Sequence, residues 1–281
     1  MAMASNGALV LTQEEFAMVC RWAYDTCGLD LKPGKEELVA SRLGKQIRRL
    51  GFASFRDYYR VLKEQSDGPV MSAAIDAITT HHTSFLREPA HFEFLNKQVF
   101  PSLAAAGRVR VWCAASSTGE EPYSLILSAE DALGSTLAQR IELMASDVSE
   151  PALEAARRGV YGADRVSALP AAWLPRYFLK GQGAFAGRYR VKPAYAQRVD
   201  FRRVNLIEPL PSIGPFSVIL CRNVMIYFDR PTQERLIERM REVLEPGGYL
   251  LVGHAESLTG VKHQLEYIHP SVYRKAGSKC R

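Results

Sequence analysis

An apolar run that ends abruptly in polar residues constrains the fold of this chain more than any other segment. Residues 216–227 read FSVILCRNVMIY, and the polar residues Arg222 and Asn223 follow directly on the apolar part. A continuous apolar run of this length is typical of a strand buried on both faces. Open parallel sheets bind ligands beyond the carboxyl ends of their strands, so Arg222, Asn223 and Tyr227 are candidate functional residues. A buried strand followed by an ordinary polar loop fits this segment equally well.

The length and composition suit a globular protein. The chain has 281 residues, enough for one large domain or two unequal ones, and its 47% hydrophobic and 23% charged residues are ordinary proportions. Its apolar runs fall short of the ~20 residues of a membrane span, and the N-terminal MAMASNGALV lacks the basic and apolar parts of a signal peptide. We therefore expect no direct insertion into a membrane.

The cysteines and the net charge narrow the environment and the partners. The five cysteines show no paired or CxxC spacing; they are Cys20, Cys27, Cys113, Cys221 and Cys280. An odd number of cysteines without the spacing of a disulfide framework indicates reduced thiols and predicts a cytoplasmic protein. The formal charge of +6 and the pI of about 9.1 favour acidic partners but are too mild to imply nucleic acid.

The first part of the chain, residues 1–80, predicts an all-helical domain. Thr12 and Glu15 have the spacing of a capping box and open an amphipathic segment. Three more helices are expected at 35–50, from Ser54 onward, and at 70–78.

One face of the second predicted helix is basic. Arg42, Lys45 and Arg49 are spaced i, i+3 and i+7, which places them on one side of a helix. The two interpretations are a solvated surface face and a docking surface for an acidic partner.

The rest of the chain predicts an α/β domain, residues 91–281, joined to the first by a linker at 81–90. Expected strands at 109–112, 141–144, 216–220 and 249–252 alternate with expected helices at 121–133, 150–158 and 232–244. Such alternation predicts a mostly parallel sheet. The segment 177–204 alternates at 188–192 and 199–204, and it predicts a small antiparallel insertion with a glycine-rich turn at 181–183.

The turn after the first strand reads ASSTGEEPYS and is not a dinucleotide fingerprint. It contains only Gly119, and Glu120 and Glu121 stand where a phosphate would need N–H donors. A ligand with an ammonium group and no phosphate, such as S-adenosylmethionine (SAM), fits better. The alternative is that these glutamates are ordinary acidic residues at a helix N-terminus.

Asp147 ends the second predicted strand. An acid at that place is the usual acceptor for ribose hydroxyls in nucleoside-binding α/β folds. Glu150 lies at capping-box spacing, so Asp147 can also serve as a helix N-cap, and the two roles can coexist.

Four segments together resemble a known family. STGEEPYS, ASDVSEPALEAARRGVYG, CRNVMIYFDRPTQ and LEPGGYLLVGHAES are similar to the CheR chemotaxis receptor methyltransferases. The resemblance implies a Rossmann-like α/β domain that uses SAM to methylate glutamate side chains on the cytoplasmic helical bundle of chemoreceptors. The products would be glutamate methyl esters and S-adenosylhomocysteine, and the enzyme would be a cytoplasmic monomer.

The resemblance also implies roles for individual residues. The family's T-N-x-T-x-F-F-R segment reads THHTSFLR here, with His81 in place of the common Asn. Glu121 would hold the methionine ammonium, Asp147 the ribose, and 205–206 the adenine. The full set of implied cofactor contacts is His81, Thr83, Arg87, Glu121, Asp147, Asn205, Leu206, Arg222 and Asn223. We expect no metal, because His81, His82 and His91 match no common metal-ligand spacing.

Arg87 and Tyr227 are the expected catalytic residues. A glutamate carboxylate is already a nucleophile at pH 7, so the protein has to align it with the methyl group and exclude water. Arg87 can hold the incoming carboxylate in a fork, and Tyr227 can orient the substrate or line the path of the methyl group. The alternatives are an inert cofactor-binding regulator, a nicotinamide-dependent oxidoreductase and a basic nucleic-acid module.

A last expectation concerns the inserted segment. Family members with a Gly-x-Gly in this place resemble one another in binding a C-terminal receptor peptide as an added strand. Gly181 and Gly183 supply that pattern here, and the nearby Arg188 can attract a peptide that ends in a carboxylate. The alternative is a tight turn in a purely structural insertion.

Overall fold

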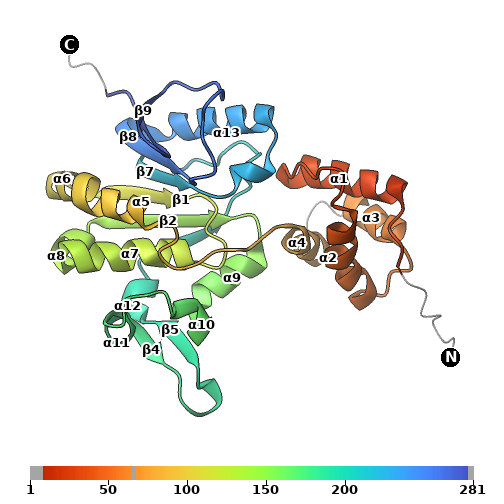
Figure 1. Ribbon diagram of the computed structural model, residues 1–281, viewed down its shortest axis with the longest axis horizontal. Coiled ribbons are helices and arrows are strands. Elements are labelled where there is room, and N and C mark those ends of the chain that lie inside the picture. Colours follow the sequence, from red (N-terminus) through yellow and green to blue (C-terminus); the bar gives the residue numbers. More distant parts are fainter. Residues whose placement is uncertain (1–8, 65–67, 278–281) are drawn as a thin grey trace. The chain divides into compact units, whose positions relative to one another are not determined.

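The computed structural model describes residues 9–64 and 68–277, and its internal contacts divide the chain into two units, 1–80 and 81–281 (Figure 1). Most of the N-terminal MAMASNGALV and the fifth cysteine, Cys280, lie outside the described residues. The other four cysteines are free thiols. In the described part of the chain, the helices are too short or too polar for any of them to cross a membrane.

The first unit is all-helical, as predicted. Its helices are α1 (Gln13–Cys27), α2 (Glu36–Arg49), α3 (Phe55–Glu64) and α4 (Pro69–Ile78). Thr12 caps α1: its hydroxyl accepts the Glu15 N–H at 3.2 Å, and the Glu15 carboxylate accepts the Thr12 N–H at 3.0 Å. Large side chains such as Leu43, Tyr58 and Ile75 are fully buried in this unit and form its core.

The basic face of α2 is only partly free. Arg42 is half-buried, and its Nη1 donates to the carbonyls of Ile78 and Thr79 at 3.0 and 3.1 Å, so it caps the end of α4. Lys45 and Arg49 are exposed. Arg42 thus has a role within the first unit, and Lys45 and Arg49 are the two residues of this basic face with exposed side chains.

The second unit is built on a seven-stranded sheet with the order β6-β2-β1-β7-β8-β10-β9. The strands are β1 (Val109–Cys113), β2 (Ile141–Asp147), β6 (Val199–Arg203), β7 (Phe216–Cys221), β8 (Leu244–Val252), β9 (Leu265–His269) and β10 (Val272–Lys275). The first five in spatial order are parallel, and β9 and β10 add an antiparallel edge. The mostly parallel sheet that the sequence predicted is confirmed.

Two apolar clusters cover the two faces of this sheet. Side chains of β1 alternate between them: Val111 belongs to one cluster and Trp112 to the other. The first cluster includes α7, and the second includes α13 (Figure 1). The helical segments of this unit are α5 (Pro89–Phe94), the π-helix η1 (Leu95–Val99), α6 (Phe100–Ala106), α7 (Glu120–Leu133), α8 (Ser135–Ala138), α9 (Glu150–Arg158), α10 (Ala163–Val166), α11 (Trp173–Tyr177), η2 (Gly183–Phe185), α12 (Pro193–Ala196), η3 (Met225–Tyr227) and α13 (Arg230–Glu242).

A second, three-stranded antiparallel sheet has the order β3-β5-β4, with β3 (Val160–Gly162), β4 (Phe178–Lys180) and β5 (Arg188–Val191). The predicted antiparallel insertion thus exists, but one part of its prediction is wrong. Residues 199–203 form β6, which pairs in parallel with β2 of the large sheet. The error has a physical cause: an edge strand of a parallel sheet has one solvated face, so its apolar and polar residues alternate as they do in an antiparallel strand.

Candidate active site

The ends of four parallel strands bring the central candidate residues to one edge of the large sheet. β1 lies between β2 and β7, and β8 follows β7. Glu121 lies in the first turn of α7, the helix that follows β1; Asp147 ends β2, Arg222 follows β7, and Gly253 follows β8. Because carboxyl ends of parallel strands meet at one edge, these residues line a common region, where an open α/β sheet binds its ligand.

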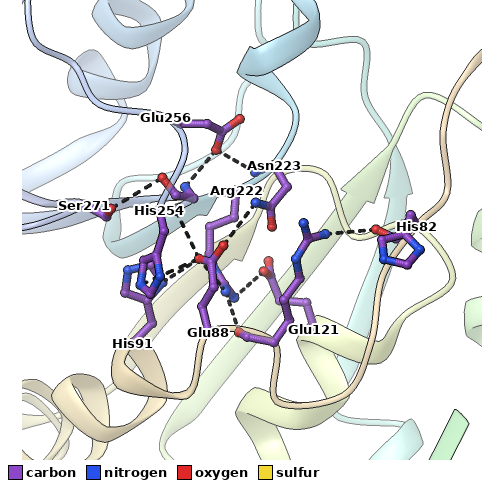
Figure 2. A network of polar contacts seen from close by, with 11 residues as sticks. His82, Glu88, His91, Glu121, Arg222, Asn223, His254, Glu256 and Ser271 are labelled. Carbon is purple, nitrogen blue, oxygen red and sulfur yellow. Dashed lines mark hydrogen bonds and ion pairs between the residues drawn. The ribbon is translucent and has the colours of Figure 1, made fainter.

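Arg222 is buried between two carboxylates (Figure 2). Its Nη1 lies 2.7 Å from Oε2 of Glu121, and its Nη2 lies 3.0 Å from Oε2 of Glu88. The Arg222 side chain is 1% exposed, and its Nε has no hydrogen-bond partner among the described residues. Burial raises the pKa of Glu121 although Arg222 opposes it. Burial also acts to raise the pKa of Glu88, but Arg222 and the hydrogen bond from Asn223 lower it below its usual value.

A further carboxylate, that of the buried Glu256, fixes the loop after β7. Glu256 accepts the N–H groups of Asn223, Gly253 and Ile226 at 2.5, 2.7 and 3.2 Å. Asn223 has a left-handed backbone with φ of 58°, and its Nδ2 donates to Glu88 at 3.2 Å. Glu256 therefore ties the ends of β7 and β8 together and holds Asn223 and Arg222 in place (Figure 2).

Asp147 joins the turns that follow β1 and β2. Its carboxylate accepts the N–H of Ser117 at 2.8 Å and the N–H of Ser149 at 3.0 Å. Burial raises the pKa of Asp147, although these bonds and the nearby His81 oppose the shift. A backbone hydrogen bond from Val148 also acts on this carboxylate, so about one of its roughly four acceptor sites remains for another donor. The hydroxyls of Ser116 and Ser117 are buried without partners in the described chain, which fits a polar ligand at this turn.

The turn after β1 separates the two adjacent glutamates. Gly119 has φ of +94°, and a Cβ there would lie 2.8 Å from Cβ of Ala156, so only glycine fits. Glu120 is fully buried and pairs with Arg165 of α10. Glu121 points to Arg222 instead. The structure thus assigns the local, structural role to Glu120 and leaves Glu121 at the site.

The segment before α5 contributes the remaining expected contacts. Arg87 is half-buried, and its Nη1 donates to the carbonyl of His82 at 2.9 Å. The Thr83 carbonyl accepts from Arg165 at 3.4 Å, and His81 lies close enough to Asp147 to influence its pKa. Phe85 is buried, and its ring packs edge-on against Tyr161 and Phe178, which anchors the segment to the rest of the second unit.

The expected adenine and methyl-side residues lie near the same strand ends. Leu206 is 6% exposed and belongs to the apolar cluster that contains Ala114 and Met144. The Asn205 amide donates to Glu208 at 2.8 Å. Tyr227 is half-buried on η3 and packs against the same cluster as Leu206.

Four residues near this site were not predicted from the sequence to belong to it: Glu88, His91, His254 and Glu256. Glu88, His91 and His254 each place one possible metal-ligand atom within 4.8 Å of the others. The Glu88 oxygens, however, already accept hydrogen bonds from Arg222, Asn223 and the His254 N–H. We therefore assign Glu88 to the Arg222 network. Glu88 directly follows the THHTSFLR segment, so its place beside that motif was the one available signal.

Comparisons with known proteins agree with this geometry. A family model described as "CheR methyltransferase, SAM binding domain" matches residues 81–274, and one described as "CheR methyltransferase, all-alpha domain" matches residues 14–79. Chemotaxis protein methyltransferase 2 of Pseudomonas aeruginosa is 40% identical over 266 residues, covering 94% of each chain. Chemotaxis protein methyltransferase of Salmonella typhimurium is 37% identical over 273 residues, covering 97% of this chain and 93% of its own.

The site fits the cofactor that the family model names. Glu121 and Asp147 can accept hydrogen bonds from an ammonium group and from ribose hydroxyls, and the turn at Gly119 presents carboxylates where a dinucleotide site needs N–H donors. The resemblance inferred from the sequence is confirmed. This chain belongs to the CheR methyltransferase family, and it is a methyltransferase whose cofactor is SAM.

Proposed function

We propose that this enzyme transfers the methyl group of SAM to glutamate side-chain carboxylates of chemoreceptors in the cytoplasm. Relatives at 37–40% identity are named chemotaxis protein methyltransferases, which supports a substrate in chemotaxis. The observation that carries the proposal is the buried charge arrangement at the strand ends. Glu121, Arg222 and Asp147 together offer recognition for a nucleoside that carries an amino-acid end.

The proposed placement of the cofactor follows from the polar groups at each strand end. The ribose lies at Asp147, the methionine ammonium at Glu121, and the adenine beside 205–206. Arg222 and Asn223 complete the wall on the β7 side. His81 and Thr83 close the site from the segment before α5.

The residues of this chain have a limited chemical task. SAM supplies an activated methyl group on a sulfonium. The incoming carboxylate needs no deprotonation at neutral pH, so we infer no general base. Arg87 positions the carboxylate through paired N–H donors, and Tyr227 lines the path beside the methyl group. Because negative charge is lost during transfer, Arg87 contributes alignment more than charge stabilisation.

The first unit is the proposed site of receptor docking. Lys45 and Arg49 are exposed on α2, and a helical bundle with acidic methylation sites would be attracted to them. Arg42 supports this surface indirectly, because it fixes α4 against α2.

The three-stranded sheet is the proposed site of a receptor C-terminal peptide. Gly183 has φ of +55°, and a Cβ on Gly181 would lie 2.0 Å from the Phe185 carbonyl, so the turn between β4 and β5 requires both glycines. Arg190 pairs with Leu179 on one side and Val160 on the other, and all three are exposed. An apolar and basic row of this kind suits an extended peptide with apolar side chains and a terminal carboxylate.

Calorimetry tests the cofactor assignment most simply. We expect S-adenosylhomocysteine to bind and NAD not to bind. Asp147→Ala should weaken S-adenosylhomocysteine by ~1–3 kcal/mol, because ribose hydroxyls lose a charged acceptor. The melting temperature of the variant serves as a control for folding, because Asp147 also joins two turns. An unchanged affinity of Asp147→Ala for S-adenosylhomocysteine would contradict the assignment of the ribose contact to Asp147.

A further inference from the structure

Glu88 has no role in the function described so far, yet it is the second carboxylate on Arg222. It lies just before Pro89, at the start of α5, and its side chain is 13% exposed. Three donors hold it: Nη2 of Arg222 at 3.0 Å, Nδ2 of Asn223 at 3.2 Å and the N–H of His254 at 3.3 Å. A side chain held this firmly has a defined place in the site (Figure 2).

The charges of the three groups do not cancel. One guanidinium contacts two carboxylates: Arg222 lowers the pKa of Glu88, and at Glu121 it opposes the burial that raises the pKa. In a buried site a single cation can neutralise only one anion. If Arg222 had Glu121 as its only partner, the pair would be neutral and would offer little attraction to a cationic ligand group.

We propose that Glu88 is a positioning and specificity residue that shares Arg222 with Glu121 and so keeps a net negative charge for the amino-acid end of the cofactor. The inference rests on the proposed role of Glu121 as the acceptor for the ammonium group. It extends that role, because the preference for a nucleoside with an amino-acid end then depends on both carboxylates and on the guanidinium between them.

This arrangement predicts a specific pattern of ligand preference. S-adenosylhomocysteine carries the ammonium group, whereas methylthioadenosine has the same nucleoside and thioether without the amino-acid end. Loss of the Glu88 charge allows Arg222 to neutralise Glu121. This loss should therefore weaken the binding of S-adenosylhomocysteine and leave the binding of methylthioadenosine unchanged. A role for Glu88 in folding alone would weaken both ligands alike.

The experiment measures the dissociation constants of both ligands by calorimetry for the full-length protein and four variants. Glu88→Gln keeps the shape and removes the charge, and it should weaken S-adenosylhomocysteine about tenfold while methylthioadenosine changes less than about twofold. Glu88→Asp keeps the charge and should recover most of the preference for S-adenosylhomocysteine over methylthioadenosine. Glu93→Gln is the matched control, because Glu93 is an exposed residue of α5 that pairs with Lys97 at 3.1 Å. Glu121→Gln should reduce the preference at least as much as Glu88→Gln.

The Glu121 and Glu88 variants distinguish a failure of the proposed cofactor placement from a failure of the role proposed for Glu88. If Glu121→Gln leaves the preference between the two ligands unchanged, the ammonium does not lie at Glu121, and the proposed placement of the cofactor fails. If Glu121→Gln reduces the preference but Glu88→Gln does not, the role of Glu88 is overturned. Equal weakening of both ligands by Glu88→Gln, without recovery in Glu88→Asp, would also overturn it.

Discussion

The adjacent residues Glu120 and Glu121 show how one position along a helix decides what a carboxylate does. Both stand in the first turn of α7, and their residue type and position do not distinguish them, although the family resemblance implied Glu121. Glu120 is fully buried and pairs with Arg165 of the neighbouring α10, while Glu121 pairs with Arg222 at the strand ends. The side chains that pack around each position, and not the local sequence, separate the structural acid from the candidate ligand.

Arg87 should affect turnover more than cofactor binding. Its guanidinium makes one described contact, to the His82 carbonyl, and its proposed partner is the substrate carboxylate. Misplacing a reacting group by about 1 Å can slow a reaction about 100-fold, so Arg87→Ala should lower kcat by roughly 100-fold. Steady-state kinetics and calorimetry with S-adenosylhomocysteine measure the two effects. Equal losses of turnover and affinity would make Arg87 a cofactor ligand instead.

His91 should make the protein sensitive to acid. Burial, reinforced by Arg222 and only partly opposed by Glu88, lowers the pKa of His91 to about 4, from an ordinary value of 6.5. The unfolded chain therefore binds this proton more readily, so the contribution of neutral His91 is complete above pH 6.5 and is lost as the pH falls toward 4. The loss is on the order of 3 kcal/mol at most.

Urea unfolding between pH 4.5 and 7 measures this effect. In His91→Gln the free energy of unfolding should depend less on pH across that window than in the native protein. Identical pH profiles for the two proteins would show that His91 does not titrate in this way.

Individual residues of the site were predictable to the extent that they occupy strand ends or family motifs. Asp147 and Arg222 follow apolar runs, so the sheet rule places them without knowledge of their partners. Glu88 and Glu256 were missed because their significance lies in partners far along the chain: Glu88 meets Arg222 after 134 residues. Burial of a carboxylate is a tertiary property that local sequence does not carry.

At the scale of elements, the existence of strands was easier to predict than their partners. The four predicted strands of the large sheet are all present, and their alternation with helices gives the parallel core. Residues 199–203 were predicted as a strand but were assigned to the wrong sheet, and the edge strand β9 and its neighbour β10 were not predicted. Edge strands carry weak patterns because solvent covers one face, so pairing is decided by the rest of the fold.

The exposed basic residues of α2 should control the encounter with the receptor. Replacing Lys45 and Arg49 by Glu should raise the Michaelis constant for a receptor cytoplasmic fragment several-fold and leave the affinity for S-adenosylhomocysteine unchanged. Arg42 is left intact because its loss would disturb α4. The reaction of the native protein should also slow as salt rises, since exposed charges are screened beyond ~8–10 Å.

A matched control replaces two exposed basic residues on other helices, Arg21 of α1 and Lys63 of α3. If this pair raises the Michaelis constant as much as the α2 pair, the effect is one of overall charge. A methylation rate that does not change with salt concentration would contradict electrostatic docking of the receptor.

The three-stranded sheet should bind a receptor peptide through its exposed face. Peptides with the C-terminal sequences of the host's own chemoreceptors are titrated against the native protein and against a variant with Arg188→Glu and Arg190→Glu. We expect binding by the native protein and a loss of about tenfold or more in the variant, because both arginines are exposed on β5. Exchange of Lys97 and Lys63 for Glu provides a control with the same change of charge. If none of the peptides binds and tail-deleted receptors are methylated normally, the insertion is purely structural.

At the scale of the whole molecule, the two units divide the proposed work. The unit at 81–281 holds the SAM site, and the unit at 1–80 presents the basic helix α2. The overall organisation was readable from the sequence because each unit has its own periodicity: helical in the first and alternating strand and helix in the second. The arrangement of charges around Arg222 was not readable, because it depends on chain segments that only the folded sheet brings together.

Transfer of a labelled methyl group to a receptor fragment tests the central claim most directly. The native protein is incubated with SAM labelled in the methyl group and with a chemoreceptor cytoplasmic fragment, and the modified residue is identified by mass spectrometry. The proposed function predicts label on glutamate side chains as an ester that alkali releases as methanol, and much less label with Asp147→Ala at subsaturating SAM. Alkali-stable label on another residue type, or no label from a protein that binds S-adenosylhomocysteine, would contradict it.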